Sequence, residues 1–233
     1  GYSSTSTSGA LLLMTANSGT GGVSGALSLS SGTTSSGNSG ALYIGSGAAS
    51  SGRGGTVYVT VGSGDSGVGG FLVLSAGSNN AGTSKSGGDV QVVTGYSSAT
   101  TSGTLWLQTS NAGTNGVSGA IVLSSGTTSD GNSGALYIGS GAALSGRGGT
   151  MYVTVGSGDS GSGGDVILSA GTSSHRSGGR VSVVSGYSST STSGAMLLMT
   201  ANSGTGGVSG ALSLSSGTTS DGNSGALYIG SGA

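Results

Sequence analysis

The sequence of 233 residues contains no cysteine, no proline and no glutamate. Without cysteine the chain can form neither disulfide bonds nor thiolate metal sites. Without proline, every backbone N–H remains available for a hydrogen-bonded ladder. Charged residues make up only 5% of the chain, against roughly 25% in an ordinary globular domain. We expect a protein with so little surface charge to associate with itself.

Long apolar runs and concentrated charge are also absent. The longest aliphatic runs, residues 11–14 and 196–199, are far shorter than the roughly 20 residues that a membrane-spanning helix needs. Five Lys and Arg against six Asp give a net charge of −1, which offers no basic patch to a nucleic acid. The sequence therefore predicts neither membrane insertion nor nucleic-acid binding.

Glycine and serine dominate what is present, with 55 and 53 residues. Such a composition is typical of disordered linkers, but 33% of the residues are hydrophobic and they recur at regular intervals. The recurring motif is a glycine followed by x-aliphatic-x-aliphatic, and we call its glycines the anchor glycines. They are Gly9, Gly25, Gly40, Gly55, Gly70, Gly88, Gly103, Gly119, Gly134, Gly149, Gly164, Gly179, Gly194, Gly210 and Gly225. Ten of the fourteen intervals are 15 residues long, three are 16 and one is 18.

Positions within a repeat are counted from its anchor glycine. Positions +2 and +4 are apolar in all fifteen repeats, and a separation of two places both side chains on one face of a strand. Because one short strand cannot bury such a face alone, stacked repeats are expected. The sequence predicts an all-β fold, a single continuous parallel β-solenoid (β-helix) over residues 1–233 with about 15 rungs of 15–16 residues. Glycine at +7 in twelve repeats predicts a turn there with positive φ.

A longer period groups the rungs in sixes. The sequence Gly-Tyr-Ser-Ser begins at Gly1, Gly95 and Gly186, which defines units 1–94, 95–185 and a partial third unit, 186–233. Residues 1–48 and 186–233 differ only at Leu11/Met196 and Ser36/Asp221. Terminal rungs of solenoids normally carry polar caps, and none is visible. We therefore expect either a segment of a longer repeat array or rods that stack end to end.

Position +3 points outward in this fold, yet it is apolar or aromatic in eleven of fifteen repeats. A solvated outer face would be polar, so the pattern indicates a lateral contact between rods. The alternative is an aromatic ladder that only stiffens the stack. The residues predicted to make the lateral contact are Tyr43, Tyr58, Trp106, Tyr137, Tyr152 and Tyr228. The predicted partner is a further copy of the chain.

Few residues could carry chemistry. The one histidine, His175, lies among serines in a turn region, and Asp65 and Asp159 recur too rarely to build the oxygen shell of a metal ion. Asp165 and Arg180 occupy position +1 of successive repeats, which predicts an exposed ion pair of about 0 to 1 kcal/mol. The sequence thus predicts no enzyme, no catalytic residues, no cofactor, no metal site and no small-molecule substrate.

The composition and the rung Gly-Gly-x-Val-x-Val/Leu-Ser-x-Gly resemble long Gly/Ser/Thr-rich repeat proteins predicted on the surfaces and appendages of algae and other protists. This resemblance implies an extracellular or cell-surface location. The leading hypothesis is a structural subunit or segment of a fibre that self-associates end to end and laterally. Two alternatives are an adhesin or tail-fibre stalk and an ice-binding (antifreeze) solenoid, although the predicted strands lack the repeated Thr-x-Thr of a regular threonine array.

Overall fold

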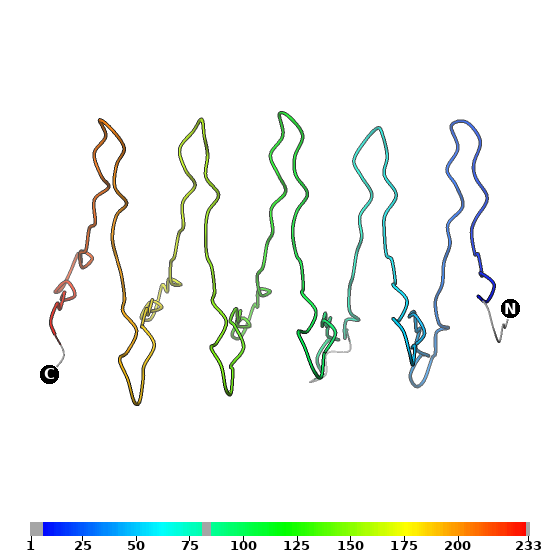
Figure 1. The fold of residues 1–233 in the computed structure, drawn as a ribbon, viewed down its shortest axis with the longest axis horizontal. Helices are drawn as coiled ribbons and strands as arrows, with labels where there is room; N and C mark the ends of the chain where they lie inside the picture. Colours follow the sequence, from blue (N-terminus) through cyan, green and yellow to red (C-terminus); the bar gives the residue numbers. More distant parts are fainter. Residues whose placement is uncertain (1–6, 81–84, 232–233) are drawn as a thin grey trace. The chain divides into compact units, whose positions relative to one another are not determined.

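The computed structural model describes residues 7–80 and 85–231 of the chain. Within these residues there is no helix and no β-strand, and Figure 1 accordingly draws neither coiled ribbons nor arrows. The predicted all-β parallel β-solenoid is therefore wrong. Its strands fail for a physical reason, since a strand needs a hydrogen-bonded neighbour and the four residues after each anchor glycine have none.

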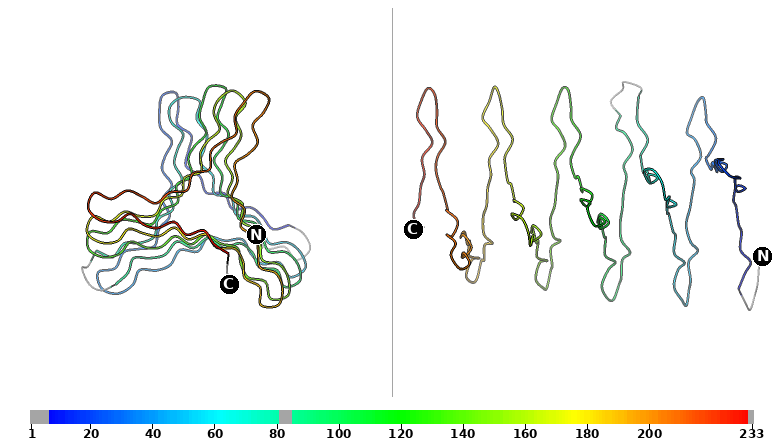
Figure 2. Two further views of the ribbon diagram at one scale, coloured as in Figure 1. Left: turned by 90° about the vertical axis from the view of Figure 1, so that its left-hand side faces the viewer. Right: turned by 90° about the horizontal axis from the view of Figure 1, so that it is seen from above.

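The chain divides into two units, Gly1–Ile121 and Val122–Ala233. In the described residues of each unit, short aliphatic segments alternate with long loops. The aliphatic segments are positions +1 to +4 of the repeats, namely residues 10–13, 26–29, 41–44, 56–59, 71–74, 89–92, 104–107, 120–123, 135–138, 150–153, 165–168, 180–183, 195–198, 211–214 and 226–229. Each loop runs from position +6 to the next anchor glycine, and its two limbs lie side by side in every view (Figures 1 and 2).

Each loop closes where its +6 residue meets the next anchor glycine, and we call this contact the neck. A Cβ placed on Gly55 would lie 3.2 Å from the Cβ of Ser46. On Gly70 it would lie only 2.6 Å from Val61 Cγ1. The same pairing recurs at every anchor glycine from Gly25 to Gly210. Glycine is required at Gly70 and Gly164, where a Cβ would lie within 2.7 Å of a valine methyl carbon, whereas at a neck such as Gly40 the distance of 3.8 Å is an ordinary contact.

Hydrogen bonds hold seven of these necks, in two ways. In four loops the anchor glycine N–H donates to the carbonyl oxygen of the +7 glycine: Gly88 to Gly77 (2.9 Å), Gly103 to Gly95 (3.0 Å), Gly179 to Gly171 (2.8 Å) and Gly194 to Gly186 (2.9 Å). In three others the hydroxyl of the +6 residue donates to the anchor carbonyl: Thr15 to Gly25 (2.9 Å), Ser46 to Gly55 (2.6 Å) and Thr109 to Gly119 (3.1 Å). In these three loops the side-chain bond is present where the backbone bond is absent.

The chain reverses at the loop tips, further from the anchor glycine than predicted. The glycines with positive φ all lie twelve positions after an anchor glycine: Gly21, Gly37, Gly67, Gly131, Gly206 and Gly222. Positive φ occurs at no described glycine of position +7, and Gly232 at that position lies outside the described residues. The predicted +7 turn is wrong, because position +7 belongs to the neck.

Serine or threonine at position +9 shapes several tips. The Ser173 hydroxyl oxygen accepts hydrogen bonds from the backbone N–H groups of His175 (3.4 Å) and Arg176 (3.0 Å). The Ser97 hydroxyl oxygen likewise accepts hydrogen bonds from the backbone N–H groups of Ala99 (3.4 Å) and Thr100 (3.0 Å). Such side-chain bonds to the backbone two or three residues ahead are a common way to fix a turn.

No described residue is buried, so residues 7–80 and 85–231 form no hydrophobic core. Apart from Leu11 at 94%, the predicted inward side chains at +2 remain about half exposed, with 48% at Val57 and 51% at Leu42, while Tyr43 at +3 reaches 91%. The order of exposure follows the predicted faces, but the predicted burial of +2 and +4 is wrong. Burial in the predicted rod required repeats stacked at hydrogen-bonding distance, which the described residues lack.

Candidate association surface

The aliphatic segments form the candidate functional site, because they hold most of the large apolar side chains and have no internal partner. Seven backbone hydrogen bonds join described residues, and all seven lie in the loops or at their necks. None involves an aliphatic segment, and neither does any side-chain hydrogen bond of residues 7–80 and 85–231. Both edges of each segment therefore present unused N–H and C=O groups.

The six aromatic residues predicted to make the lateral contact all lie at the centre of an aliphatic segment. Their exposed fractions run from 77% to 92%: Trp106 77%, Tyr58 82%, Tyr152 82%, Tyr43 91%, Tyr228 91% and Tyr137 92%. None makes a ring contact or a hydrogen bond with another described residue. The six side chains are thus individually exposed, and the structure does not bring them together.

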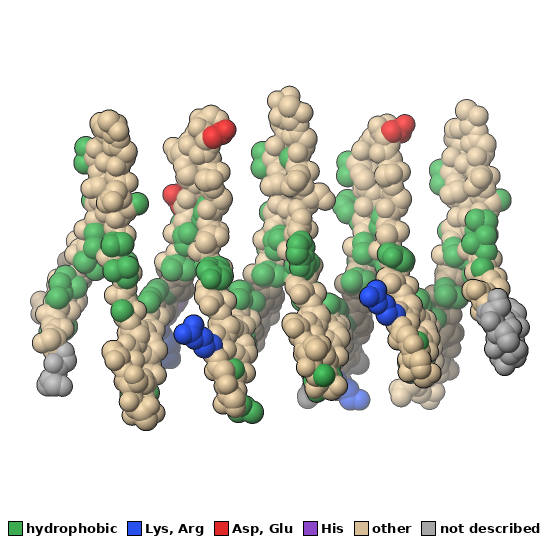
Figure 3. Space-filling model, in the orientation of Figure 1, with side chains coloured by type: hydrophobic (Ala, Val, Ile, Leu, Met, Phe, Trp, Pro, Cys, Tyr) green, Lys and Arg blue, Asp and Glu red, His purple; other side chains and the backbone are tan. Residues whose placement is uncertain are grey.

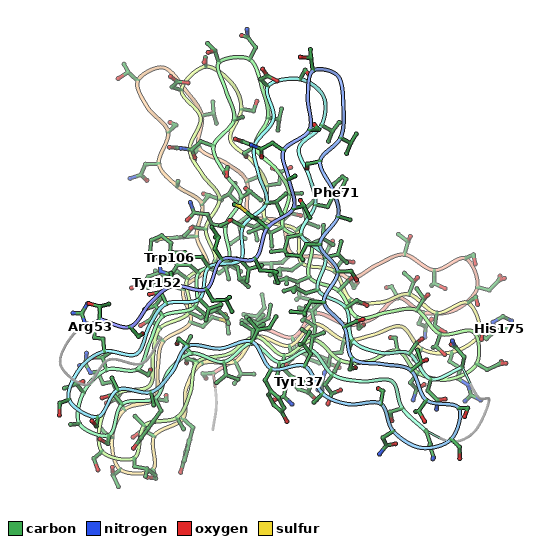
Figure 4. All side chains as sticks on the ribbon, turned by 90° about the vertical axis from the view of Figure 1, so that its right-hand side faces the viewer. Arg53, Phe71, Trp106, Tyr137, Tyr152 and His175 are labelled. Atoms are coloured by element: carbon green, nitrogen blue, oxygen red, sulfur yellow. The ribbon has the colours of Figure 1, made fainter. Side chains whose placement is uncertain are left out.

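Most large hydrophobic side chains lie in the aliphatic segments, and eight of the eleven charged residues lie in the loops. Figure 3 shows hydrophobic side chains gathered at the bases of the loops, whereas most of the loop surface is backbone and side chains that are neither hydrophobic nor charged. In Figure 4, Trp106, Tyr137 and Tyr152 lie near the bases of loops, whereas Arg53 and His175 lie at loop tips. The aliphatic segments therefore offer apolar surface with little charge to oppose contact.

The polar residues singled out in the sequence form no site. Asp165 and Arg180 make no ion pair, so that prediction is wrong; it assumed stacked repeats. The Nδ1 of His175 lies 2.7 Å from the hydroxyl of its neighbour Ser174 and has no acidic partner. Among the described residues there is no pocket and no group of three His, Cys, Asp or Glu that could hold a metal ion.

No helix in residues 7–80 or 85–231 has both the length and the hydropathy to cross a membrane.

The necks were not anticipated from the sequence, although a signal for them exists. Position +6 carries only small or β-branched residues, as at Thr15, Val61, Ala76, Thr94 and Val155. This restriction matches the close approach of each +6 residue to the next anchor glycine. Small side chains that recur nine to twelve residues before each anchor glycine could have predicted the contact.

No family model matches the chain, and neither a curated protein nor a solved structure is significantly similar to it. The resemblance to Gly/Ser-rich surface repeat proteins accordingly remains a prediction from the residues alone.

Proposed function

We propose that this chain is a structural subunit of an extracellular or cell-surface fibre and that it works by associating with further copies of itself. The observation that carries the proposal is the exposure of the aliphatic segments. Even the most shielded column of these segments, position +2, is about half exposed, as Leu42 at 51% and Leu136 at 56% illustrate. Covering such side chains is worth roughly 1.5 to 3 kcal/mol each when burial is complete.

The surface area of the chain indicates that one copy lacks the burial a stable fold needs. It exposes 22754 Å², where a compact protein of 21.3 kDa would expose about 9,000 Å² and its unfolded chain about 31,000 Å². One copy therefore buries about a third of the area that a compact fold would bury. Burial on this scale falls short of offsetting the conformational entropy of ordering the chain, and contact with further copies supplies the rest.

The nature of the surface favours copies of the same chain over a small ligand or a charged polymer. No pocket exists in the described part of the chain. The net charge of −1 and the 5% of charged residues place little repulsion between copies. The repeat also presents the same aliphatic segment many times, so that each added contact reinforces the others.

Sedimentation velocity on the full chain over a wide concentration range, with electron microscopy of the same samples, tests this function. We expect large, elongated assemblies that form from the purified chain alone and grow with concentration. A chain that sediments as a monomer at every concentration would contradict the proposal.

A further inference from the structure

We infer that the aliphatic segments are chain-pairing segments, each of which hydrogen-bonds along both of its edges, in parallel and in register, to the same segment of further copies of this chain. This inference rests on the proposed function and specifies the contact through which the copies associate. In such a contact, the backbone of positions +1 to +4 lies at the centre and the loops lie outside it.

The first support is the unused backbone. At residues 41–44, for example, no N–H or C=O group is bonded within the chain, and the same holds for the other fourteen segments. The segments contain Val, Ile and Tyr, which favour strands, and they contain no proline. Unpaired groups on such a segment form an edge to which another chain can add.

The second support is the match between partners. The loops interrupt the chain at every repeat, and their necks fix where each aliphatic segment begins and ends. A partner chain can pair with successive aliphatic segments only if its own loops are spaced at the same intervals along the chain. The intervals are unequal, since one is 18 residues and three are 16. A copy of this chain in parallel register matches all of them, whereas an antiparallel copy meets the intervals in reverse order.

The third support is the side-chain pattern. Parallel pairing in register places like residues about 4.8 Å apart, so that Tyr43 meets Tyr43 and Leu42 meets Leu42. Only three of the fifteen segments carry a charge, at Asp89, Asp165 and Arg180. Like charges therefore face each other at few points, and each such point destabilises the pairing by about 1 kcal/mol or less.

The absence of cysteine makes a direct test possible, because one introduced cysteine is the only thiol. Ser28, Ser182 and Ser213 occupy position +3, and the variants Ser28→Cys, Ser182→Cys and Ser213→Cys each accept one nitroxide spin label. In assemblies of one labelled variant, parallel pairing in register brings labels of adjacent copies to about 4.8 Å. We expect the electron paramagnetic resonance spectrum to collapse to a single exchange-narrowed line.

Two further measurements serve as controls. Tenfold dilution of the labelled chain with unlabelled chain separates the labels, and the narrowed line should disappear while the assemblies persist. Wild-type chain labelled with ¹³C at the leucine carbonyls needs no substitution; parallel stacking of these carbonyls shifts the ¹³C amide I infrared band, and the same dilution removes the shift.

The outcomes separate this inference from the function on which it rests. Narrowing at the three positions, or the dilution-sensitive infrared shift, supports parallel pairing in register. Assemblies that show neither signal overturn the pairing and leave the proposed fibre function standing, with contact through the loops or in another register. A wild-type chain that stays monomeric overturns both.

Discussion

Val61 meets Gly70 at the neck of a loop so closely that a Cβ on the glycine would lie 2.6 Å from Val61 Cγ1. The equivalent pair in the next six-repeat unit, Val155 and Gly164, gives 2.7 Å. Valine has one strongly restricted side-chain torsion and cannot easily move away. The neck therefore depends on the missing side chain of the anchor glycine.

Replacement of Gly70 by alanine should open this neck. Overpacking of this kind costs about 1 to 3 kcal/mol, and we expect the nuclear Overhauser contact between Val61 methyl protons and residue 70 to be lost. The control is Gly69→Ala, because a Cβ there meets nothing within 4 Å. Adding the second substitution Val61→Ala to Gly70→Ala should close the neck again, which a contact between the β methyl protons of residue 61 and residue 70 would show. An open neck in that double variant would contradict the steric explanation.

Replacement of Gly222 by alanine should disturb a loop tip. Gly222 has φ +134°, which side-chain-bearing residues rarely adopt, and such conformations cost of order 1 to 3 kcal/mol. We expect faster limited proteolysis in residues 218–224 of the full chain. The matched control is Gly217→Ala, which has open space around it and no positive φ. Equal cleavage of the two variants would show that tip conformation does not depend on glycine.

Removal of the Ser46 hydroxyl should weaken a neck that no backbone bond supports. The hydroxyl donates to the Gly55 carbonyl at 2.6 Å, and a bond of this type contributes about 0.5 to 1.5 kcal/mol. Ser46→Ala should therefore weaken the nuclear Overhauser contact between the β protons of residue 46 and the α protons of Gly55. Ser50→Ala serves as the control, since Ser50 makes no hydrogen bond. An unchanged contact in Ser46→Ala would mean that the bond does not hold the loop.

Substitution of aromatic residues in the aliphatic segments should weaken association more than the same change in the loops. The double variant Tyr43→Ser/Tyr137→Ser removes side chains that are 91% and 92% exposed. The matched control, Tyr96→Ser/Tyr187→Ser, removes two loop tyrosines that are 88% exposed.

We expect the first variant to raise the concentration needed for assembly about tenfold or more, since losing ~1.4 kcal/mol changes an equilibrium constant tenfold. The control should assemble like wild type. Sedimentation velocity compares the two, and equal weakening would remove the distinction between segments and loops.

The sequence predicted the repeat and the order of exposure within it better than it predicted the fold. The anchor glycines and the alternation of Leu42, Tyr43 and Ile44 can be read directly, because local spacing fixes which side chains share a face. Whether such a face becomes buried depends on what lies against it. The sequence pattern allows the apolar face to be covered either by another repeat of the same chain or by a repeat of another copy. The solenoid prediction assumed that repeats of the same chain cover each other.

The turn was misplaced for a related reason. Glycine occurs both at position +7, as at Gly77, and at position +12, as at Gly222, and composition alone does not separate their roles. The first accepts the neck hydrogen bond through its carbonyl, and the second supplies positive φ at the tip. The hydrogen bond from Gly88 N–H to the Gly77 carbonyl oxygen places position +7 at the neck. The turn therefore belongs to position +12.

Amide hydrogen exchange of the full chain, measured residue by residue below and above the assembly concentration, shows whether the aliphatic segments gain hydrogen bonds only when copies associate. In the isolated copy, the amides of segments such as 41–44 and 135–138 should exchange almost as fast as in an unfolded peptide, because they have no hydrogen-bond partner. In assemblies the same amides should become strongly protected. Protection of these segments in the monomer, or its absence in the assemblies, would contradict the account.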